Sequence, residues 1–338
     1  MQRRVTIVDV ARHAGVSTAA VSKVLRNAYG VSSAMQERVR GSMTELGYRP
    51  HAAARGMRGK TYTIGVLLDS IRNPFFADIL DGVQDEIGAT DYQVLVGAAG
   101  FGAAEQARLA DAMVDRRMDG LILIAPAIPK VDVVRTAAST PTVVVGHHDR
   151  GAEFDTVVDD DAAGARLVVD HLADLGHRRI AHHSTPGTPA SRWTGTPELV
   201  IRKAFSEAMQ QHGLQEQAQV AITGYSEQAG YEAGMQLLRP RRRPTAIFSG
   251  ADVAALGVLR AVHELGLRVP DDVSVVGYNN IAFAAQPEIH LTTVDQAGFA
   301  MGASAARLLL ERIDGRTRSV MTSMSPRLVV RGSTSALR

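Results

Sequence analysis

Apolar residues along the chain follow two different spacings, and the change between them falls near residue 60. Before it, Met35, Val39, Met43 and Leu46 recur at the spacing of one helix face. From Thr63 on, short apolar runs alternate with amphipathic stretches of helical length. The pattern predicts a small helical segment followed by a much longer α/β region.

The start of the helical segment carries clear boundary signals. Thr6 with Asp9 three positions later resembles a capping box, and a first helix runs from there to about Ala14. Gly15 supplies the backbone freedom that a tight turn needs, and Ser17 caps a second helix. These signals predict two helices joined by a short turn.

A third helix begins at Ser32 or Ser33 and ends at Gly47. The small Ala11 and the apolar Val21 fall where two helices that cross at a tight angle need close approach and a core contact. This spacing favours a helix-turn-helix over an unrelated helical hairpin, which remains the alternative.

The α/β region predicts two doubly wound, parallel-sheet subdomains whose ligand binds outside the carboxyl ends of the strands. Residues 319–338 are expected to form a final strand and a short tail. The ten strand-like runs before them are Ile64–Leu68, Gln93–Val96, Leu121–Ile124, Thr142–Val145, Val157–Val158, Ile180–His182, Gln219–Ile222, Ala246–Phe248, Val273–Val276 and Leu291–Val294. Helical stretches between them include Phe76–Ile87, Arg166–Leu175 and Ala303–Ile313.

Charge is divided unevenly along the chain. Residues 1–60 hold 11 Lys and Arg against 3 acids, whereas the remaining residues hold 26 against 32. A basic segment on a mildly acidic body is typical of a polyanion-binding module on a carrier, although a solvated basic face is the plainer interpretation.

The chain contains no cysteine, which excludes disulfides, thiolate catalysis and thiolate metal sites. No apolar run has the length of a signal peptide or of a membrane span. We therefore expect a cytoplasmic protein with no membrane partner.

If the helix-turn-helix interpretation holds, the second helix lies in the major groove of DNA. Thr18, Ala19 and Lys23 are then the outward-facing candidates for base contacts, and Lys23 can donate to guanine. The residues expected to hold phosphates are Ser17, Ser22, Arg26, Ser32 and Ser33.

The stretch VTIVDVARHAGVSTAAVSKVLRN, Val5–Asn27, resembles the head of the LacI/GalR family of bacterial regulators. The resemblance covers nearly the whole chain. It continues through Val31–Ser32, Glu45–Pro50, Asn73–Phe76, Asp119–Ile122, His171–Ile180, Arg243–Phe248 and Gly266–Tyr278.

The resemblance implies a homodimer, with a tetramer left open, whose two heads read a palindromic operator in double-stranded DNA. It implies a head at 1–49, a hinge at 50–60, and a core like that of periplasmic sugar-binding proteins at 61–338. One subdomain would take about 61–160 and 296–323, and the other about 161–295 and 324–338. In the hinge, Met57 matches a side chain that wedges into the minor groove, and Ala54 matches the position where paired hinge helices approach. Gly56 should weaken this hinge helix.

The expected DNA-binding set combines the head and the hinge. It comprises Thr6, Ser17, Thr18, Ala19, Ser22, Lys23, Arg26, Asn27, Ser32, Ala54 and Met57.

The effector is expected to be a small molecule, a sugar or sugar derivative first and a nucleoside or purine second, because aromatic platforms with a few polar groups suit such ligands. For each aromatic candidate, core packing is the alternative role. The effector-binding set is Phe75, Phe76, His147, Asp159, Arg192, Trp193, Arg202, Tyr225, Asp252 and Asn279.

Three positions depart from the family pattern. Ile201 stands where many members carry a ligand-clamping Arg, and Arg202 is the nearest substitute. Ala251 replaces an Asn, and Asn279 replaces an acid that commonly contacts the ligand. The stretch 184–197, with Arg192 and Trp193, is interpreted as lying over the cleft mouth, with an ordinary surface loop as the alternative.

Two other classes of protein use similar cores. A transport-associated binding protein would need an export signal and has no use for a basic head. An α/β enzyme would need an acid/base pair, and no such arrangement is evident in the sequence. We therefore expect no catalytic residues, no metal site and no cofactor, and an allosteric transcription repressor in place of an enzyme.

Overall fold

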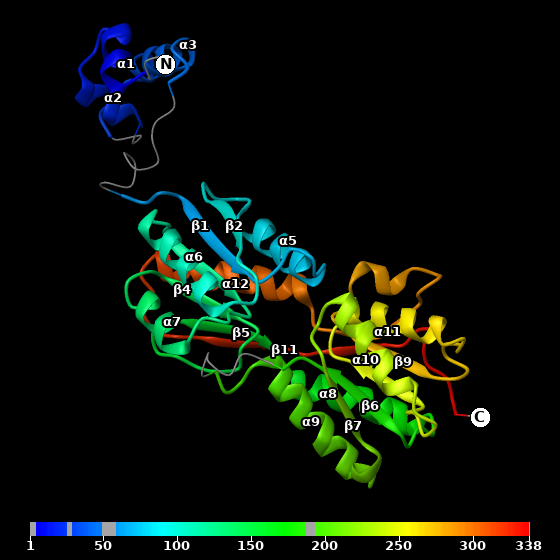
Figure 1. The fold of residues 1–338 in the computed structure, drawn as a ribbon. Helices are drawn as coiled ribbons and strands as arrows, with labels where there is room; N and C mark the ends of the chain where they lie inside the picture. The colour runs from blue at the N-terminus through cyan, green and yellow to red at the C-terminus, as the bar shows by residue number, and fades with distance from the viewer. Residues whose placement is uncertain (1–4, 26–28, 49–58, 187–192, 338) are drawn as a thin grey trace. The chain divides into compact units, whose positions relative to one another are not determined.

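The computed structural model describes residues 5–25, 29–48, 59–186 and 193–337. They belong to two compact units that divide between Tyr62 and Thr63. The described residues of the first unit form three helices, α1 (Ile7–Ala14), α2 (Thr18–Leu25) and α3 (Ser33–Glu45) (Figure 1).

Each boundary of the first two helices follows from local chemistry. The backbone N–H and hydroxyl of Thr6 both donate to Asp9 Oδ2, at 2.9 and 2.7 Å, and so begin α1. Gly15 ends it with φ of 65°, a conformation that costs glycine little. Ser17 Oγ accepts from the N–H of Ala20 at 3.1 Å, which begins α2. The capping box, the turn and the second cap that the sequence predicts are confirmed.

A single apolar core holds the three helices together. Val10, Ala11, Val21, Val24 and Val39 are its most buried members. The stripe predicted on the third helix contributes Met35, Met43 and Leu46 around them. Helices this short are marginally stable alone, so most of their stability comes from their mutual packing.

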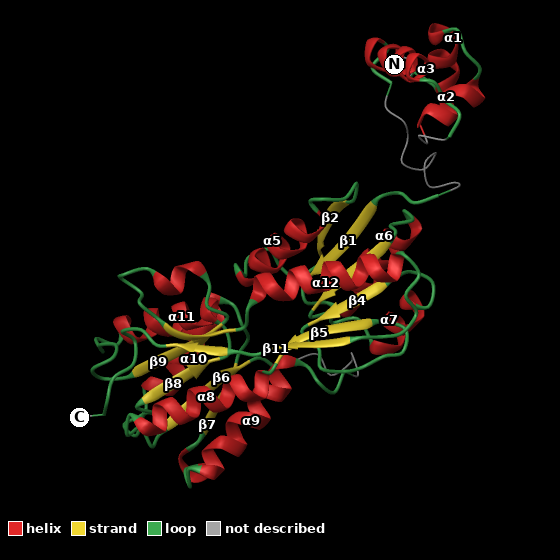
Figure 2. Cartoon of the chain, turned by 180° about the vertical axis from the view of Figure 1, so that it is seen from behind, coloured by secondary structure: helices red, strands yellow, loops and turns green. Residues whose placement is uncertain are grey.

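The second unit contains two six-stranded sheets (Figures 1 and 2). Sheet A has the order β11-β5-β4-β3-β1-β2 and sheet B the order β12-β10-β9-β8-β6-β7. Every pairing is parallel except that of β10 with β12. The strands are β1 (Thr63–Leu68), β2 (Gln93–Ala98), β3 (Gly120–Ile124), β4 (Thr142–Val145), β5 (Asp155–Asp159), β6 (Ile180–Ser184), β7 (Gln219–Ile222), β8 (Ala246–Ser249), β9 (Ser274–Tyr278), β10 (Thr292–Asp295), β11 (Met321–Met324) and β12 (Arg327–Val329).

Helices cover both faces of each sheet (Figure 2). In sheet A, α5 packs against α12 on one face and α6 against α7 on the other; in sheet B the pairs are α8 with α9 and α10 with α11. The helices are α5 (Phe75–Ile87), α6 (Ala103–Asp115), α7 (Lys130–Ala137), α8 (Asp161–Asp174), α9 (Pro197–Gln211), α10 (Glu227–Leu238), α11 (Asp252–Glu264) and α12 (Gly298–Ile313), with short 3₁₀ turns η2 (Gln215–Gln217) and η3 (Ala282–Ala285). The α/β fold class with a helical head is confirmed.

Glycines let the paired helices approach closely in both halves of the unit. A Cβ on Gly302 of α12 would overlap the carbonyl oxygen of Ile79 in α5. A Cβ on Gly257 of α11 would overlap the carbonyl oxygen of Glu227 in α10. Backbone thus packs on backbone, and larger side chains have no room at these crossings.

The chain passes between the sheets three times. It leaves sheet A after β5, returns to it after β10, and leaves again between β11 and β12. The end of the chain differs from the prediction, because 319–338 forms two short strands, one in each sheet, where one strand was expected. Ser325 and Pro326 separate the two, and the polar Met321–Met324 shows no strand-like alternation.

Both sheets share one strand order, which places a topological switch point at equivalent positions. In sheet A the order reverses between β1 and β3, and in sheet B between β6 and β8. Ligands of doubly wound sheets bind outside the carboxyl ends of the strands at such points. The residues that follow β1, β6 and β8 are therefore where a small-molecule site is expected.

Candidate functional site

The second helix of the first unit presents a polar, basic face. Thr18, Ala19 and Lys23 are exposed, whereas Val21 and Val24 of the same helix are buried in the core. Ser17 is exposed while its hydroxyl caps α2, and Ser32 Oγ caps α3 by accepting from Met35 N–H. The helix therefore has one side committed to packing and one side free for a ligand.

Not every predicted DNA contact is described by the structure. Thr6 is exposed at the start of α1, and Ser22 is half-buried on α2. Arg26, Asn27, Ala54 and Met57 lie outside the described residues, as does Arg192 of the effector set.

In the second unit, several buried polar atoms have no hydrogen-bond partner among the described residues. Asp69 directly follows β1, Ser184 ends β6, and Tyr225 follows β7. A Cβ on Gly250, just after β8, would overlap the hydroxyl of Tyr225, so this hydroxyl lies at the end of β8. The unpartnered Asp69 Oδ1, Ser184 Oγ and Tyr225 hydroxyl therefore occupy both switch points. Buried polar groups without partners are costly, and a ligand that bonds to them removes that cost.

Burial shifts the ionisation of these groups. It raises the pKa of the Asp69 carboxyl to about 6. It also raises the pKa of the Tyr225 hydroxyl, although the nearby Ser184 hydroxyl opposes this shift without reaching hydrogen-bonding geometry. Both groups are therefore more easily kept neutral than in water.

The predicted aromatic residues divide into different environments. Phe75 is buried and its ring lies against Gly298 at the start of α12, so it packs in the core. Phe76 is half-buried, with its ring centroid 6.3 Å from that of Phe75. Tyr225 is the predicted aromatic residue whose hydroxyl is one of the unpartnered polar atoms.

In two of the predicted effector-binding acids, both carboxylate oxygens accept hydrogen bonds from other residues of the protein. Asp159 accepts from the Tyr278 hydroxyl at 3.1 Å and from Gln296 Nε2 at 3.0 Å. Asp252 accepts from the Thr293 hydroxyl at 2.5 Å and from the Ile281 N–H at 2.9 Å. Each carboxylate oxygen therefore already accepts one hydrogen bond within the protein, and each acid positions its neighbours.

Arg202 and Glu198 lie one turn apart on α9. Glu198 is buried and Arg202 is half-buried. The charges of both act on the Tyr225 hydroxyl, so both side chains lie within electrostatic reach of that group. Sequence reasoning included Arg202 but missed Glu198, whose place in the first turn of a helix gave it an ordinary structural role.

Trp193 joins the two halves of the second unit. Its chain segment follows β6 of sheet B, but the indole packs with Phe154, Val133 and Ile128 beside sheet A. The indole N–H donates to the Ile128 carbonyl at 2.8 Å, and the ring meets His147 edge-on at 4.5 Å. Trp193 belongs to the stretch that was expected to cover a cleft mouth. In the structure its side chain is anchored in a core instead.

The residues next to Trp193 strengthen this anchor. Asp149 accepts from the Thr194 hydroxyl at 2.9 Å and from the Gly195 N–H at 2.7 Å, and it pairs with Lys130 at 3.1 Å. Although burial opposes ionisation, these bonds keep the pKa of Asp149 below its usual value. His147 is buried, which lowers its pKa to about 3 and keeps the ring neutral.

We expect the fluorescence of Trp193, the only tryptophan in the sequence, to resist quenching by acrylamide in the native protein. Its side chain is 5% exposed and lies within packed core residues, so the quencher has no direct access. A Stern–Volmer titration in buffer and in concentrated urea measures this. Equal quenching in the two would show that the anchor is open in solution.

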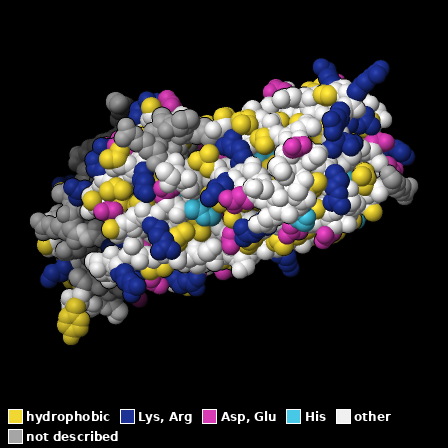
Figure 3. Space-filling model, turned by 90° about the horizontal axis from the view of Figure 1, so that it is seen from below, with side chains coloured by type: hydrophobic (Ala, Val, Ile, Leu, Met, Phe, Trp, Pro, Cys, Tyr) yellow, Lys and Arg dark blue, Asp and Glu magenta, His cyan; other side chains and the backbone are white. Residues whose placement is uncertain are grey.

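Other kinds of site receive no support in the part of the chain that the structure describes. Its His, Asp and Glu residues form no group of three with the spacing of a metal site. None of its helices is long and apolar enough to cross a membrane. Both signs of charge occur across the face shown in Figure 3, with apolar side chains scattered between them.

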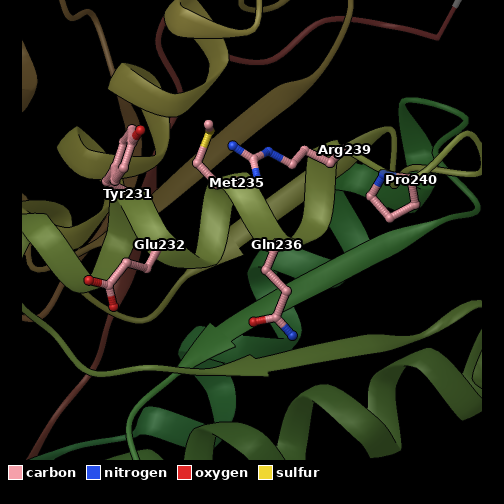
Figure 4. A pocket seen from close by; sticks show the side chains of 6 residues that line it. All are labelled: Tyr231, Glu232, Met235, Gln236, Arg239 and Pro240. Atoms are coloured by element: carbon pink, nitrogen blue, oxygen red, sulfur yellow. The ribbon is translucent and has the colours of Figure 1, made fainter.

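A hollow of about 550 Å³ lies on α10, lined by Tyr231, Glu232, Met235, Gln236, Arg239 and Pro240 (Figure 4). It includes the carboxyl end of α10, which leads into the amino end of β8. The switch points are at the opposite edge of the sheet, so this hollow is separate from the unpartnered polar atoms.

Comparisons with known proteins match residues in each of the two units. Residues 6–51 match a family described as bacterial regulatory proteins, lacI family. Residues 169–334 match a periplasmic binding protein-like domain.

Full-length relatives cover both parts. The HTH-type transcriptional repressor PurR of Erwinia tasmaniensis is 34% identical over 97% of this chain and 96% of its own. A lac repressor dimer bound to operator and the anti-inducer ONPF is 27% identical, with a TM-score of 0.80 over 99% of this chain and 100% of its own. A complex of the transcriptional regulator CelR with cellobiose is 28% identical, with a TM-score of 0.70 over 98% of this chain and 100% of its own.

Proposed function

Because this chain belongs to the LacI family of bacterial transcriptional regulators, we propose that it represses transcription as a homodimer whose two heads read the halves of a palindromic operator. The observation that carries this proposal is the exposed face of α2, where Lys23 stands beside Thr18 and Ala19 on a packed helix-turn-helix. A repressor that acts on bacterial operator DNA works in the cytoplasm, and this location is part of the proposal.

Exposed apolar residues support the homodimer. Leu95 and Val96 lie on the edge strand β2 and are 51% and 47% exposed; Phe283 on η3 is 46% exposed. An apolar edge strand left uncovered invites pairing with another chain. A second copy of this chain is the partner that fits, since the operator-bound lac repressor is also a dimer.

The effector site of this proposal lies at the carboxyl ends of sheets A and B. Its support is the set of buried, unpartnered polar atoms at the two switch points, Asp69, Ser184 and Tyr225. A sugar or sugar derivative suits these groups, and a nucleoside is the alternative. The binding of cellobiose by CelR is consistent with the first class.

Selection of sites from random duplex DNA tests the regulator. We expect a palindrome of about 14–20 base pairs, which is two major-groove half-sites. Enrichment of no sequence above a salt-sensitive background, with candidate effectors both present and absent, would contradict the proposal.

Lys23→Ala is expected to weaken binding to the selected operator by roughly 1–3 kcal/mol and to relax the preference at one base pair of each half-site. Binding should weaken because the variant lacks the Lys23 ammonium group, which donates a hydrogen bond to a base edge. Arg26→Ala is the matched control, because the loss of a phosphate contact should weaken all DNA alike and flatten the salt dependence. Fluorescence anisotropy with operator and scrambled duplexes separates the two, and a uniform loss for Lys23→Ala would remove it from the base-reading set.

A further inference from the structure

Hydrogen bonds link three side chains in a row. Two of these residues lie where the polypeptide passes between the sheets, and the third follows β9. Asp159 ends β5, Gln296 lies between β10 and α12, and Asn279 follows β9. Gln296 Nε2 donates to Asp159 Oδ1 at 3.0 Å, and Asn279 Nδ2 donates to Gln296 Oε1 at 2.6 Å. All three residues are at most 9% exposed, so water has little access to these bonds.

The hydrogen bonds between these three side chains can run in one direction only. A carboxylate oxygen can only accept, so Gln296 must turn its NH₂ group toward Asp159. The Gln296 oxygen then faces Asn279, which must turn its own NH₂ group toward it. Asn279 Oδ1 is left over, and it is buried without a hydrogen-bond partner among the described residues.

Protonation of Asp159 does not change the direction of these hydrogen bonds. Burial and the neighbouring Asp161 raise the pKa of Asp159 well above its usual value. The Tyr278 hydroxyl lies 3.1 Å from both Asp159 Oδ2 and Asp161 Oδ1 but has one proton to share between them. A proton held on Asp159 Oδ2 completes that contact, while Oδ1 still accepts from Gln296.

We propose that Asp159 and Gln296 are positioning residues that fix the Asn279 amide with its oxygen toward the effector, so that the effector must donate a hydrogen bond there. This inference rests on the proposed effector site. It explains the departure from the family pattern at Asn279: with its NH₂ group occupied, the amide offers the ligand an acceptor, as an acid would, without a buried charge.

The class of effector follows from this polarity. Asp69 Oδ1, across from sheet B at the end of β1, is also an unpartnered carboxylate oxygen. Hydroxyl and amine groups donate to such atoms, whereas phosphate and carboxylate oxygens only accept. At these two atoms the site therefore favours a polyol, an amino sugar or an N–H-bearing ring over an oxyanion.

An exchange of the two end residues tests the direction of the chain. Asn279→Asp places an acceptor against the Gln296 oxygen, and at pH 8 we expect a melting temperature lower by about 4 °C or more, followed by Trp193 fluorescence. Adding Asp159→Asn reverses the chain: the new amide donates to Gln296 Oε1, and Gln296 donates to the new acid. The double variant is expected to recover most of the loss.

The control removes the same charge from outside the chain. Asp161→Asn combined with Asn279→Asp relieves charge repulsion without offering Gln296 a donor, so it should recover much less. Equal recovery in the two double variants, or no loss in Asn279→Asp, would overturn the proposed chain.

The amide orientation has a direct readout in the unliganded protein. In wild type the Asn279 NH₂ protons are bonded to Gln296 Oε1 and should exchange slowly with solvent, whereas Gln296→Leu removes this acceptor and frees them. We expect exchange about tenfold faster or more in that variant, measured by NMR on ¹⁵N-asparagine-labelled protein with the signal assigned by its loss in Asn279→Asp. Equal rates would overturn the orientation. Neither experiment involves DNA, so a failure here is separate from a failure of the regulator proposal.

Discussion

Replacing Gly302 by valine is expected to destabilise the second unit by about 3 kcal/mol, a large part of the roughly 5–15 kcal/mol by which proteins are typically stable. The added side chain would overlap the backbone of Ile79 in α5, and backbone cannot move aside as a flexible side chain can. Urea unfolding followed by Trp193 fluorescence measures the effect, since this tryptophan lies in the same unit.

Arg307→Val is the matched control for Gly302→Val. It introduces the same residue into the same helix, but at an exposed position, where helix propensity changes and one hydrogen bond to the Ser304 hydroxyl is lost, so the cost is below about 1 kcal/mol. If the two valine variants unfold at the same urea concentration, the close helix crossing does not exist in solution.

Asp252 is expected to make the core less stable as the pH rises. Burial raises the pKa of this carboxyl from 3.8 to about 6, against the opposing bonds from Thr293 and Ile281. An acid with a raised pKa binds its proton more tightly when folded, so its contribution is fully present below pH 3.8 and is lost as the pH rises through 6. The difference corresponds to roughly 3 kcal/mol. Asp69, with a pKa also raised to about 6, acts in the same direction.

Comparing wild type with Asp252→Asn isolates this contribution. The Asn oxygen can still accept from the Ile281 N–H and its NH₂ can donate to the Thr293 hydroxyl, and the unfolding free energy of the variant should fall less steeply than that of wild type between pH 4 and pH 8. Urea titrations at four pH values give the two slopes. Parallel slopes would mean that Asp252 ionises in the folded state as it does in water.

Local signals predicted local structure well. The cap at Thr6, the turn at Gly15 and the cap at Ser17 each depend on residues within four positions of one another, so the sequence alone indicates them. The long apolar strands were equally readable, because a parallel sheet buried on both faces needs continuous apolar runs. The two short strands at the end were not, because β11 and β12 depend on partners far away in the chain.

The candidate effector site was harder to predict for the same reason. Asp159 was identified as an acid near the ligand, but its role depends on Gln296, which lies 137 positions away. Trp193 attracted attention as the only tryptophan, yet its contact with Ile128 could not be foreseen from neighbouring residues. Asp69 was missed, although an acid directly after the first core strand is a signal that could have found it.

The three passages between the sheets determine the order in which the protein can be completed during synthesis. The described residues of the three-helix head end at residue 48, so the head can fold while the rest of the chain is still being made. Sheet A begins with β1 but receives α12 and β11 only after nearly all of sheet B has been translated. At roughly 5–20 residues per second, this delay lasts tens of seconds. A nascent chain therefore carries a finished DNA-reading module long before it has a core able to restrain it.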